Sequence, residues 1–202
     1  QQELIRYRQQ VDQQLSLTTE VLAKVGFNDL NQQLSQLEIS LKKGRAQVDA
    51  YTRMPRQQRN AQEMDQAILA MFAAWESCRE LLRGVAMTSD SSSTHLKNYI
   101  SQILFLSDLR DQAGRVASSV MAHVTFDTPL PTENITRSLQ TQHQVRYLWS
   151  LIDTLQPAQD KTEEFIRLHR RVETEFIQQG LPIVSELIDD SLEQRDYHLS
   201  GT

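Results

Sequence analysis

Residues 64–85, MDQAILAMFAAWESCRELLRGV, form the most regular segment of the sequence. Apolar or small side chains recur every three or four residues over three heptads, at Met64, Ile68, Met71, Trp75, Cys78, Leu82 and Val85. An α-helix turns once in 3.6 residues, so this spacing places the whole series along one helix face. We therefore expect a long amphipathic helix here, with Met71 and Trp75 in the core.

Stripes of the same kind lie on both sides of this segment and predict further helices. They comprise Leu4, Val11, Leu15, Leu22 and Val25; Leu30, Leu34, Leu37, Leu41, Gly44, Val48 and Tyr51; and Tyr99, Ile103, Leu106, Arg110, Ala113, Ala117, Val120 and Val124. Narrow stripes with an average spacing of about 3.5 residues favour near-parallel helix packing. We expect an all-α fold: an elongated antiparallel helical bundle, built as two stacked four-helix-type bundles that share a long helix.

The expected organisation is a single all-helical domain over residues 1–202. It can be divided into sub-bundles 1–109 and 110–202, with the boundary inside the long helix. Near the end of the chain, Gly180-Leu181-Pro182 predicts a break, because glycine often ends a helix and proline often begins one. A short helix carrying Val184, Leu187 and Ile188 is expected to follow this break.

Charge and cysteine content exclude several classes of protein. The formal net charge is -5, and the 21 basic residues are scattered among 26 acidic ones. Nucleic-acid binding needs a concentrated basic face, so we expect no nucleic-acid partner. Cys78 is the only cysteine, so an intramolecular disulfide cannot form. No stretch approaches the roughly 18 apolar residues of a membrane span, and no signal peptide is recognisable.

Motifs for catalysis or metal binding were sought around the five histidines. None of them has an acidic residue three positions earlier, as the di-iron sites of helical bundles require. No His-Glu-x-x-His zinc motif, haem-attachment motif or glycine-rich phosphate loop occurs either. We therefore expect a domain that is not an enzyme and holds no cofactor or metal.

Arg110 is the charged residue that the periodicity sends inward, between Leu106 and Ala113. One interpretation is a structural ion pair with Asp111, Asp108 or an acid on a neighbouring helix, or an arginine that extends to solvent. The other is an arginine that binds an anionic ligand, because guanidinium presents a planar set of donors to carboxylates. Arg110, Asp111 and Arg115 are therefore candidate ligand-binding residues.

A second candidate cluster consists of Arg146, Tyr147 and Trp149, beside a polar stretch at residues 140–144. A polar patch edged by aromatic side chains can line a small-molecule pocket. In the alternative interpretation, Trp149 belongs to the core and Arg146 is solvated.

Several short motifs follow one another in an order that resembles a known family. They are Leu109-Arg110-Asp111-Gln112-Ala113-Gly114-Arg115, Pro129-Leu130, Tyr147-Leu148-Trp149, Phe176, Gly180-Leu181-Pro182 and Tyr197-His198-Leu199-Ser200, with Arg8, Val11-Asp12 and residues 45–51 also fitting. This order is similar to that of the all-helical periplasmic sensor regions of bacterial transmembrane receptors, among them diguanylate cyclases, histidine kinases and chemoreceptors. The resemblance spans nearly the whole chain.

The resemblance implies an extracytoplasmic signal-sensing domain of a bacterial inner-membrane receptor, located in the periplasm. Such a domain would relay binding by helix displacement to a cytoplasmic output module, with membrane helices flanking this sequence. The implied partners are a small molecule, anionic if Arg110 contacts it, or a periplasmic protein, and a second copy in a homodimer.

Family members continue after the segment matching Leu199-Ser200 with a helix that returns to the membrane. No such helix follows here, so the completeness of the chain stays open. The alternative to a sensor is a non-catalytic helical scaffold or a partner-binding spacer domain.

Overall fold

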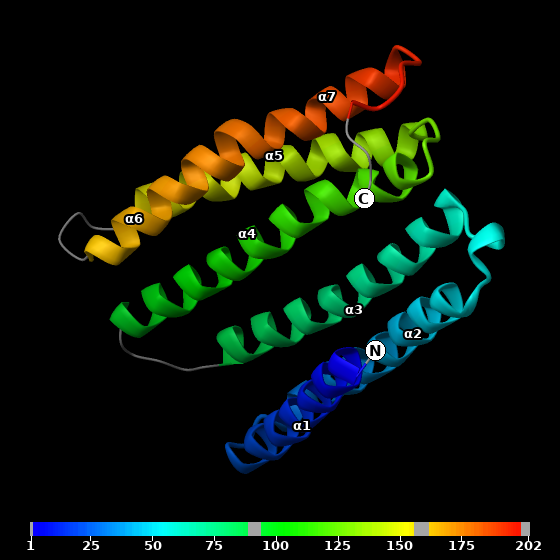
Figure 1. Cartoon of the computed structure of the whole chain (residues 1–202). Helices are drawn as coiled ribbons and strands as arrows, with labels where there is room; N and C mark the ends of the chain where they lie inside the picture. Colours follow the sequence, from blue (N-terminus) through cyan, green and yellow to red (C-terminus); the bar gives the residue numbers. More distant parts are fainter. Residues whose placement is uncertain (1, 89–93, 156–161, 199–202) are drawn as a thin grey trace. The chain divides into compact units, whose positions relative to one another are not determined.

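The computed structural model describes residues 2–88, 94–155 and 162–198, and every regular element among them is helical. The all-α prediction is therefore confirmed. The elements are α1 (Gln2–Lys24), η1 (Asn28–Leu30), α2 (Asn31–Arg53), η2 (Arg56–Gln58), α3 (Ala61–Thr88), α4 (Thr94–Thr125), α5 (Thr132–Leu155), α6 (Glu163–Arg171), η4 (Val172–Gly180) and α7 (Leu181–Leu192) (Figure 1). In the described part, no helix is both long and apolar enough to cross a membrane.

The chain divides into two compact units. Unit 1 contains Gln1–Asp49 and Leu69–Ser92, and unit 2 contains Ala50–Ile68 and Ser93–Thr202. The divisions fall within α2 and α3 and before α4, whereas we expected a boundary at 109/110 inside the long helix. The long helix is not divided because α4 packs along α5, which makes both part of unit 2. The stacking of two bundles stays a prediction.

Unit 1 has a small leucine core where α1, α2 and α3 meet. Its buried residues are Leu22, Leu30, Leu34, Leu37 and Leu81, with Leu15, Phe27, Cys78 and Val85 packed against them. The predicted stripe position Gly44 lies where α2 approaches α3 closely: a Cβ atom there would lie 2.9 Å from the Ala70 carbonyl oxygen. A side chain at position 44 would therefore force α2 and α3 apart.

Unit 2 has the larger core, formed by α4, α5, η4 and α7. Its buried residues include Leu109, Val116, Val120, Val145, Trp149, Ile152, Ile177, Leu181, Val184, Leu187 and Ile188. Small polar residues are also buried: Ser119 on α4 is 1% exposed, and Ser138 on α5 is fully buried. Small side chains at these positions allow the close packing of α4 on α5.

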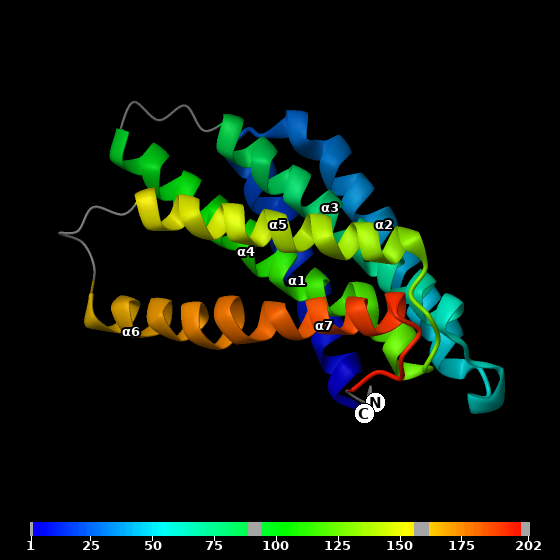
Figure 2. The same ribbon diagram turned by 90° about the horizontal axis from the view of Figure 1, so that it is seen from above.

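The predicted break at Gly180-Leu181-Pro182 is wrong. Gly180 has helical dihedral angles (φ -69°, ψ -45°), and α6, η4 and α7 form one continuous helix (Figure 2). η4 is a π-helix, in which the Leu181 amide donates to the Phe176 carbonyl five residues earlier. A proline ring clashes with the carbonyl four residues before it in an α-helix, and the wider π-helix immediately before Pro182 relieves that clash.

The π-helix also affects packing. Before Gly180, Phe165, His169, Val172 and Phe176 are partly buried and Ile177 is buried; after it, Leu181, Val184, Leu187 and Ile188 are buried. Ile177 lies four residues before Leu181, as on one face of a regular α-helix, whereas Phe176 lies five residues before it. The wider turn of the π-helix lets Phe176 pack against the same core as Ile177 and Leu181.

Three helix ends share one hydrogen-bond pattern. At the end of α1 the Phe27 amide donates to the Leu22 carbonyl and the Gly26 amide to the Ala23 carbonyl, which is the Schellman motif. The same pair of bonds ends α4 around Asp127 and α7 around Gln194. The motif requires a left-handed residue, and φ is +84° at Gly26, +48° at Asp127 and +56° at Gln194.

Candidate functional site

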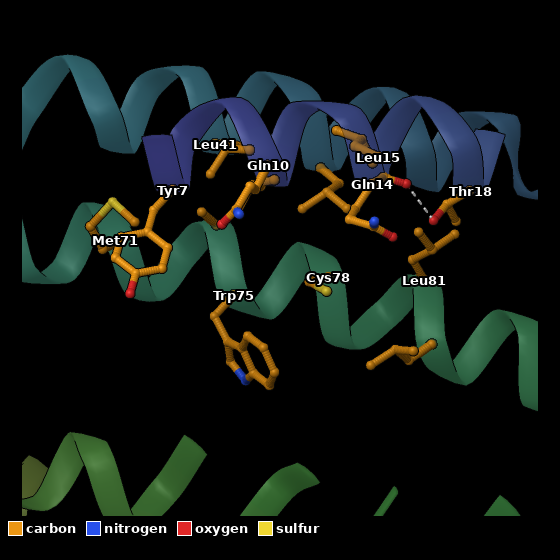
Figure 3. A pocket seen from close by; sticks show the side chains of 14 residues that line it. Tyr7, Gln10, Gln14, Leu15, Thr18, Leu41, Met71, Trp75, Cys78 and Leu81 are labelled. Atoms are coloured by element: carbon orange, nitrogen blue, oxygen red, sulfur yellow. Dashed lines mark hydrogen bonds between the residues drawn. The ribbon is translucent and has the colours of Figure 1, made fainter. Parts of the chain in front are cut away.

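An apolar groove of about 560 Å³ lies within unit 1. Its walls are α1 and α3, and Leu37 and Leu41 of α2 also line it (Figure 3). The lining residues are Tyr7, Gln10, Val11, Gln14, Leu15, Thr18, Leu37, Leu41, Met71, Ala74, Trp75, Cys78, Leu81 and Leu82. The volume is within the range of small-molecule sites, which are concave and mostly apolar.

The groove is uncharged: none of its lining residues is acidic or basic. Its polar groups lie mainly along α1, where Gln10, Gln14 and Thr18 follow one another at intervals of four residues and therefore on one helix face. The Thr18 hydroxyl donates to the Gln14 carbonyl at 2.8 Å (Figure 3). Tyr7 and Met71 lie at one end, and Thr18 and Leu81 lie at the other.

The α3 wall corrects a prediction from the sequence. Periodicity placed Met71 in the core, yet its side chain is 37% exposed and lines the groove, and Leu82 is 39% exposed. The residues of α3 that are fully packed include Ala67, Ala74 and Leu81. Each of them lies one position before a residue of the predicted stripe. Periodicity cannot separate a packed face from a groove wall, because both require apolar side chains.

Two ion pairs hold α1 against α2. Arg8 donates to both carboxylate oxygens of Asp49, at 3.0 and 2.8 Å, and Arg45 donates to Asp12 at 2.8 Å. The hydrogen bonds with Asp49 raise the pKa of the Arg8 guanidinium above its ordinary value, so the guanidinium is always charged. We call these four residues the charge clasp.

The charge clasp is built from a repeated pentapeptide. Residues 8–12 are RQQVD and residues 45–49 are RAQVD, so each helix offers arginine and aspartate one turn apart on the same face. The arginine of one helix pairs with the aspartate of the other. The residues that fit the family resemblance include Arg8, Asp12, Arg45 and Asp49. In the structure these four residues contact one another across α1 and α2.

The predicted cluster on α4 has a different geometry from the one expected. Arg110 is exposed, so the prediction that it points inward is wrong; its neighbour Leu109, 8% exposed, occupies the core position. Asp111 and Arg115 pair with each other along α4, with Nε and Oδ2 2.8 Å apart. Between residues 109 and 116 the core face of α4 runs through Leu109, Gln112 and Val116, one residue away from the predicted stripe, whereas Val120 and Val124 of that stripe are buried as predicted.

The predicted cluster on α5 is separated into an exposed and a buried residue. Arg146 is exposed, whereas Trp149 is buried in the core of unit 2. The Trp149 ring stacks on His169 with centroids 4.4 Å apart, and its indole N–H donates to Glu173 of η4. None of Arg110, Asp111, Arg115, Arg146 and Trp149 lines the unit 1 groove.

The C-terminal motif contacts the α4–α5 turn. The Tyr197 hydroxyl donates to the Thr128 carbonyl at 2.8 Å, and the Leu130 amide donates to the Ser191 hydroxyl at 2.7 Å. His198 hydrogen-bonds Asp190 at 2.6 Å, and this bond keeps the pKa of Asp190 below its ordinary value. Residues 199 and 200 of the same motif lie outside the described residues.

Within the described ranges, no group of three or more His, Cys, Asp or Glu side chains could hold a metal ion. Comparisons with models of protein families, with curated proteins and with solved structures found no match to this chain.

Proposed function

We propose that this chain is the extracytoplasmic signal-sensing domain of a bacterial transmembrane receptor, and that the unit 1 groove is where the signal binds. The observation that carries the proposal is the construction of the groove. One wall, α1, is held to α2 by the charge clasp, and the space beside it is lined by uncharged and mostly apolar groups. The family resemblance of the sequence supports the receptor assignment.

In this proposal α1 is the helix that moves. Partly exposed ion pairs contribute only about 0–1 kcal/mol each, so the charge clasp orients α1 without fixing it rigidly. A ligand between α1 and α3 replaces water at the apolar wall and presses α1 outward. Helix shifts of about 1–2 Å are typical of switching proteins, and such a shift of α1 is the signal.

Spin-label distances test the coupling without a ligand. Labels on Gln13 of α1 and Ala73 of α3 report the moving wall, and labels on Lys43 of α2 and Ala73 provide the reference pair; all three positions are exposed. Cys78 lines the groove, so the labelled pairs are compared in Cys78→Ser and Cys78→Phe backgrounds. The phenyl ring of Cys78→Phe occupies part of the groove.

The Gln13–Ala73 distance should increase by about 1–2 Å in the Cys78→Phe background, with the Lys43–Ala73 distance unchanged. If neither distance changes, the groove is a rigid binding surface and the chain is a passive scaffold. This outcome is the alternative function considered from the sequence.

The extracytoplasmic location has its own test. Alkaline phosphatase inserted after Thr202 of the intact protein, in its own host, should be active, and β-galactosidase at the same position should be inactive. The opposite pattern would place the chain in the cytoplasm and reject the receptor assignment.

A further inference from the structure

We propose that the ligand of the unit 1 groove is an uncharged, elongated and largely apolar small molecule with hydrogen-bonding groups along one edge. This inference rests on the proposed function and specifies the chemistry of the same site. It replaces the anionic ligand that Arg110 suggested, because Arg110 is exposed and belongs to unit 2.

The absence of charge in the groove lining determines the ligand's charge. Burying an ionised group without a partner costs several kcal/mol, and none of the fourteen lining side chains can neutralise one. The four residues of the charge clasp are already paired with each other. An ionised ligand would therefore lose its hydration and gain no counter-charge.

The shape of the groove determines the ligand's length. Its lining extends from Tyr7 to Thr18 along α1, which corresponds to about 16 Å at 1.5 Å per residue. A volume of about 560 Å³ over that length describes a narrow slot. A narrow slot fits a chain-like molecule better than a compact one, and it is too small for a protein helix about 10 Å across.

The polar groups define which edge of the ligand is polar. Gln10 and Gln14 extend from α1 towards α3 (Figure 3), and their side-chain amides can both donate and accept. The opposite side is formed by Met71, Ala74, Trp75, Cys78, Leu81 and Leu82 of α3, and its polar side-chain groups are only the Trp75 indole N–H and the weakly donating Cys78 thiol. Hydroxyl, ether or amide groups along one edge of the ligand would meet the glutamines, and hydrocarbon would face α3.

Two dyes that differ by one charge test this assignment. N-phenyl-1-naphthylamine is neutral, and 8-anilinonaphthalene-1-sulfonate has the same ring system with a sulfonate. The wild-type chain should bind the neutral dye at least tenfold more tightly, measured by fluorescence titration. 1-Decanol should displace the neutral dye, and decanoate should not.

Three substitutions assign the binding to the groove. Met71→Arg and Gln14→Arg each place a cation in the lining. Both should weaken binding of the neutral dye at least tenfold and change the preference of the chain to the sulfonate dye. Gln14 is exposed on α1, so its variant keeps the test valid if Met71→Arg fails to fold. Met87→Arg is the control on α3, the helix that carries Met71, because Met87 is 88% exposed and does not line the groove.

Different failures have different meanings. The wild-type chain could prefer the sulfonate dye, with Gln14→Arg strengthening that preference. The proposed ligand class would then be wrong, but the groove would still be the binding site. If neither dye binds, and sedimentation velocity shows self-association that Gln14→Arg abolishes, a second copy covers the groove. That result would reject both the ligand class and the proposed function. Equal binding of both dyes in all variants would show that the dyes bind elsewhere, and would reject the assignment to the groove.

Discussion

A Cβ atom on Gly44 would lie 2.9 Å from the carbonyl oxygen of Ala70 and 3.0 Å from the sulfur of Met71. The contact joins α2 to the groove wall of α3 in unit 1. The carbonyl belongs to the backbone, so it cannot move aside without moving the helix.

Gly44→Ala should therefore destabilise unit 1. Alanine gains about 1 kcal/mol over glycine in a helix interior, but overpacking costs about 1–3 kcal/mol, so we expect a net loss of up to about 2 kcal/mol. Gly114→Ala is the control, because nothing lies within 4 Å of a Cβ atom there and the position is exposed. The control should gain up to about 1 kcal/mol. Urea unfolding measures both, and a stabilised Gly44→Ala protein would contradict the close α2–α3 approach.

The π-helix can be removed by a deletion. Without Gln179, which is exposed, Phe176 and Leu181 would be four residues apart and their faces would match in a regular α-helix. Pro182→Ala must accompany the deletion, since an interior proline costs about 3 kcal/mol or more. The combined variant should keep its helicity and unfold cooperatively, as followed by circular dichroism.

Deleting Gln144 is the matched control for this experiment. Gln144 is also an exposed glutamine, but its loss rotates Trp149 and Ile152 out of the core of unit 2. This variant should lose cooperative unfolding. Equal damage from both deletions would show that the π-helix does not compensate for an extra residue.

The left-handed residue at the end of α7 offers a stabilising substitution. Gln194 has a φ of +56°, which costs a residue with a side chain more than it costs glycine. Gln194→Gly should raise the free energy of unfolding by up to about 1.5 kcal/mol, because the left-handed conformation costs an L-residue about 1–2 kcal/mol and the greater backbone freedom of glycine costs about 0.5–1 kcal/mol. The same change at exposed Gln140 inside α5 should lower it by about 1 kcal/mol. A thermal melt of the two variants compares them directly, and a destabilised Gln194→Gly protein would mean that the capping geometry is different.

His123 predicts a pH dependence of stability. It is 8% exposed and hydrogen-bonds Thr128, and its burial lowers its pKa despite the opposing influence of Asp65. The folded state thus binds this proton less readily than the unfolded state does. The stability that His123 contributes is fully present above its unfolded-state pKa of about 6.5, and this contribution is lost as the pH falls below that value.

The contribution of His123 can be isolated by substitution. From pH 7.5 to 5.5, wild-type stability should fall with a slope from this residue of at most about 1.4 kcal/mol per pH unit. His123→Gln should remove that slope, whereas His143→Gln, at an exposed position, should retain it. Urea midpoints at both pH values would decide, and an unchanged slope in His123→Gln would assign the pH dependence to other groups.

The helical class could be predicted from the sequence, because the three-to-four-residue period of apolar side chains reports helix directly. The register of α4 could not. Tyr99, Ile103 and Leu106 form an apolar stripe but are exposed, while polar His123 and Ser119 lie in the core of unit 2. His123 is hydrogen-bonded to Thr128 and Ser119 to the Val116 carbonyl, which makes their burial tolerable. Such partners become known only when the helices are assembled.

The candidate groove escaped prediction for a different reason. Cysteine, methionine and tryptophan residues on α3 were assigned to a core, and nothing in their spacing distinguishes a core from an open slot. One signal was present: the repeated pentapeptides at residues 8–12 and 45–49 indicate that α1 pairs with α2. This signal becomes informative once the two helices are known to be antiparallel.

The repeated pentapeptide gives the α1–α2 hairpin a local two-fold axis between Arg8–Asp49 and Asp12–Arg45. Rotation about that axis exchanges the two ion pairs. When α1 slides along α2, both pairs change length together, so displacement from this register weakens both at once. The charge clasp thus restores α1 to one position along α2, and under the proposed function the molecule that enters the groove would set the direction in which α1 leaves that position.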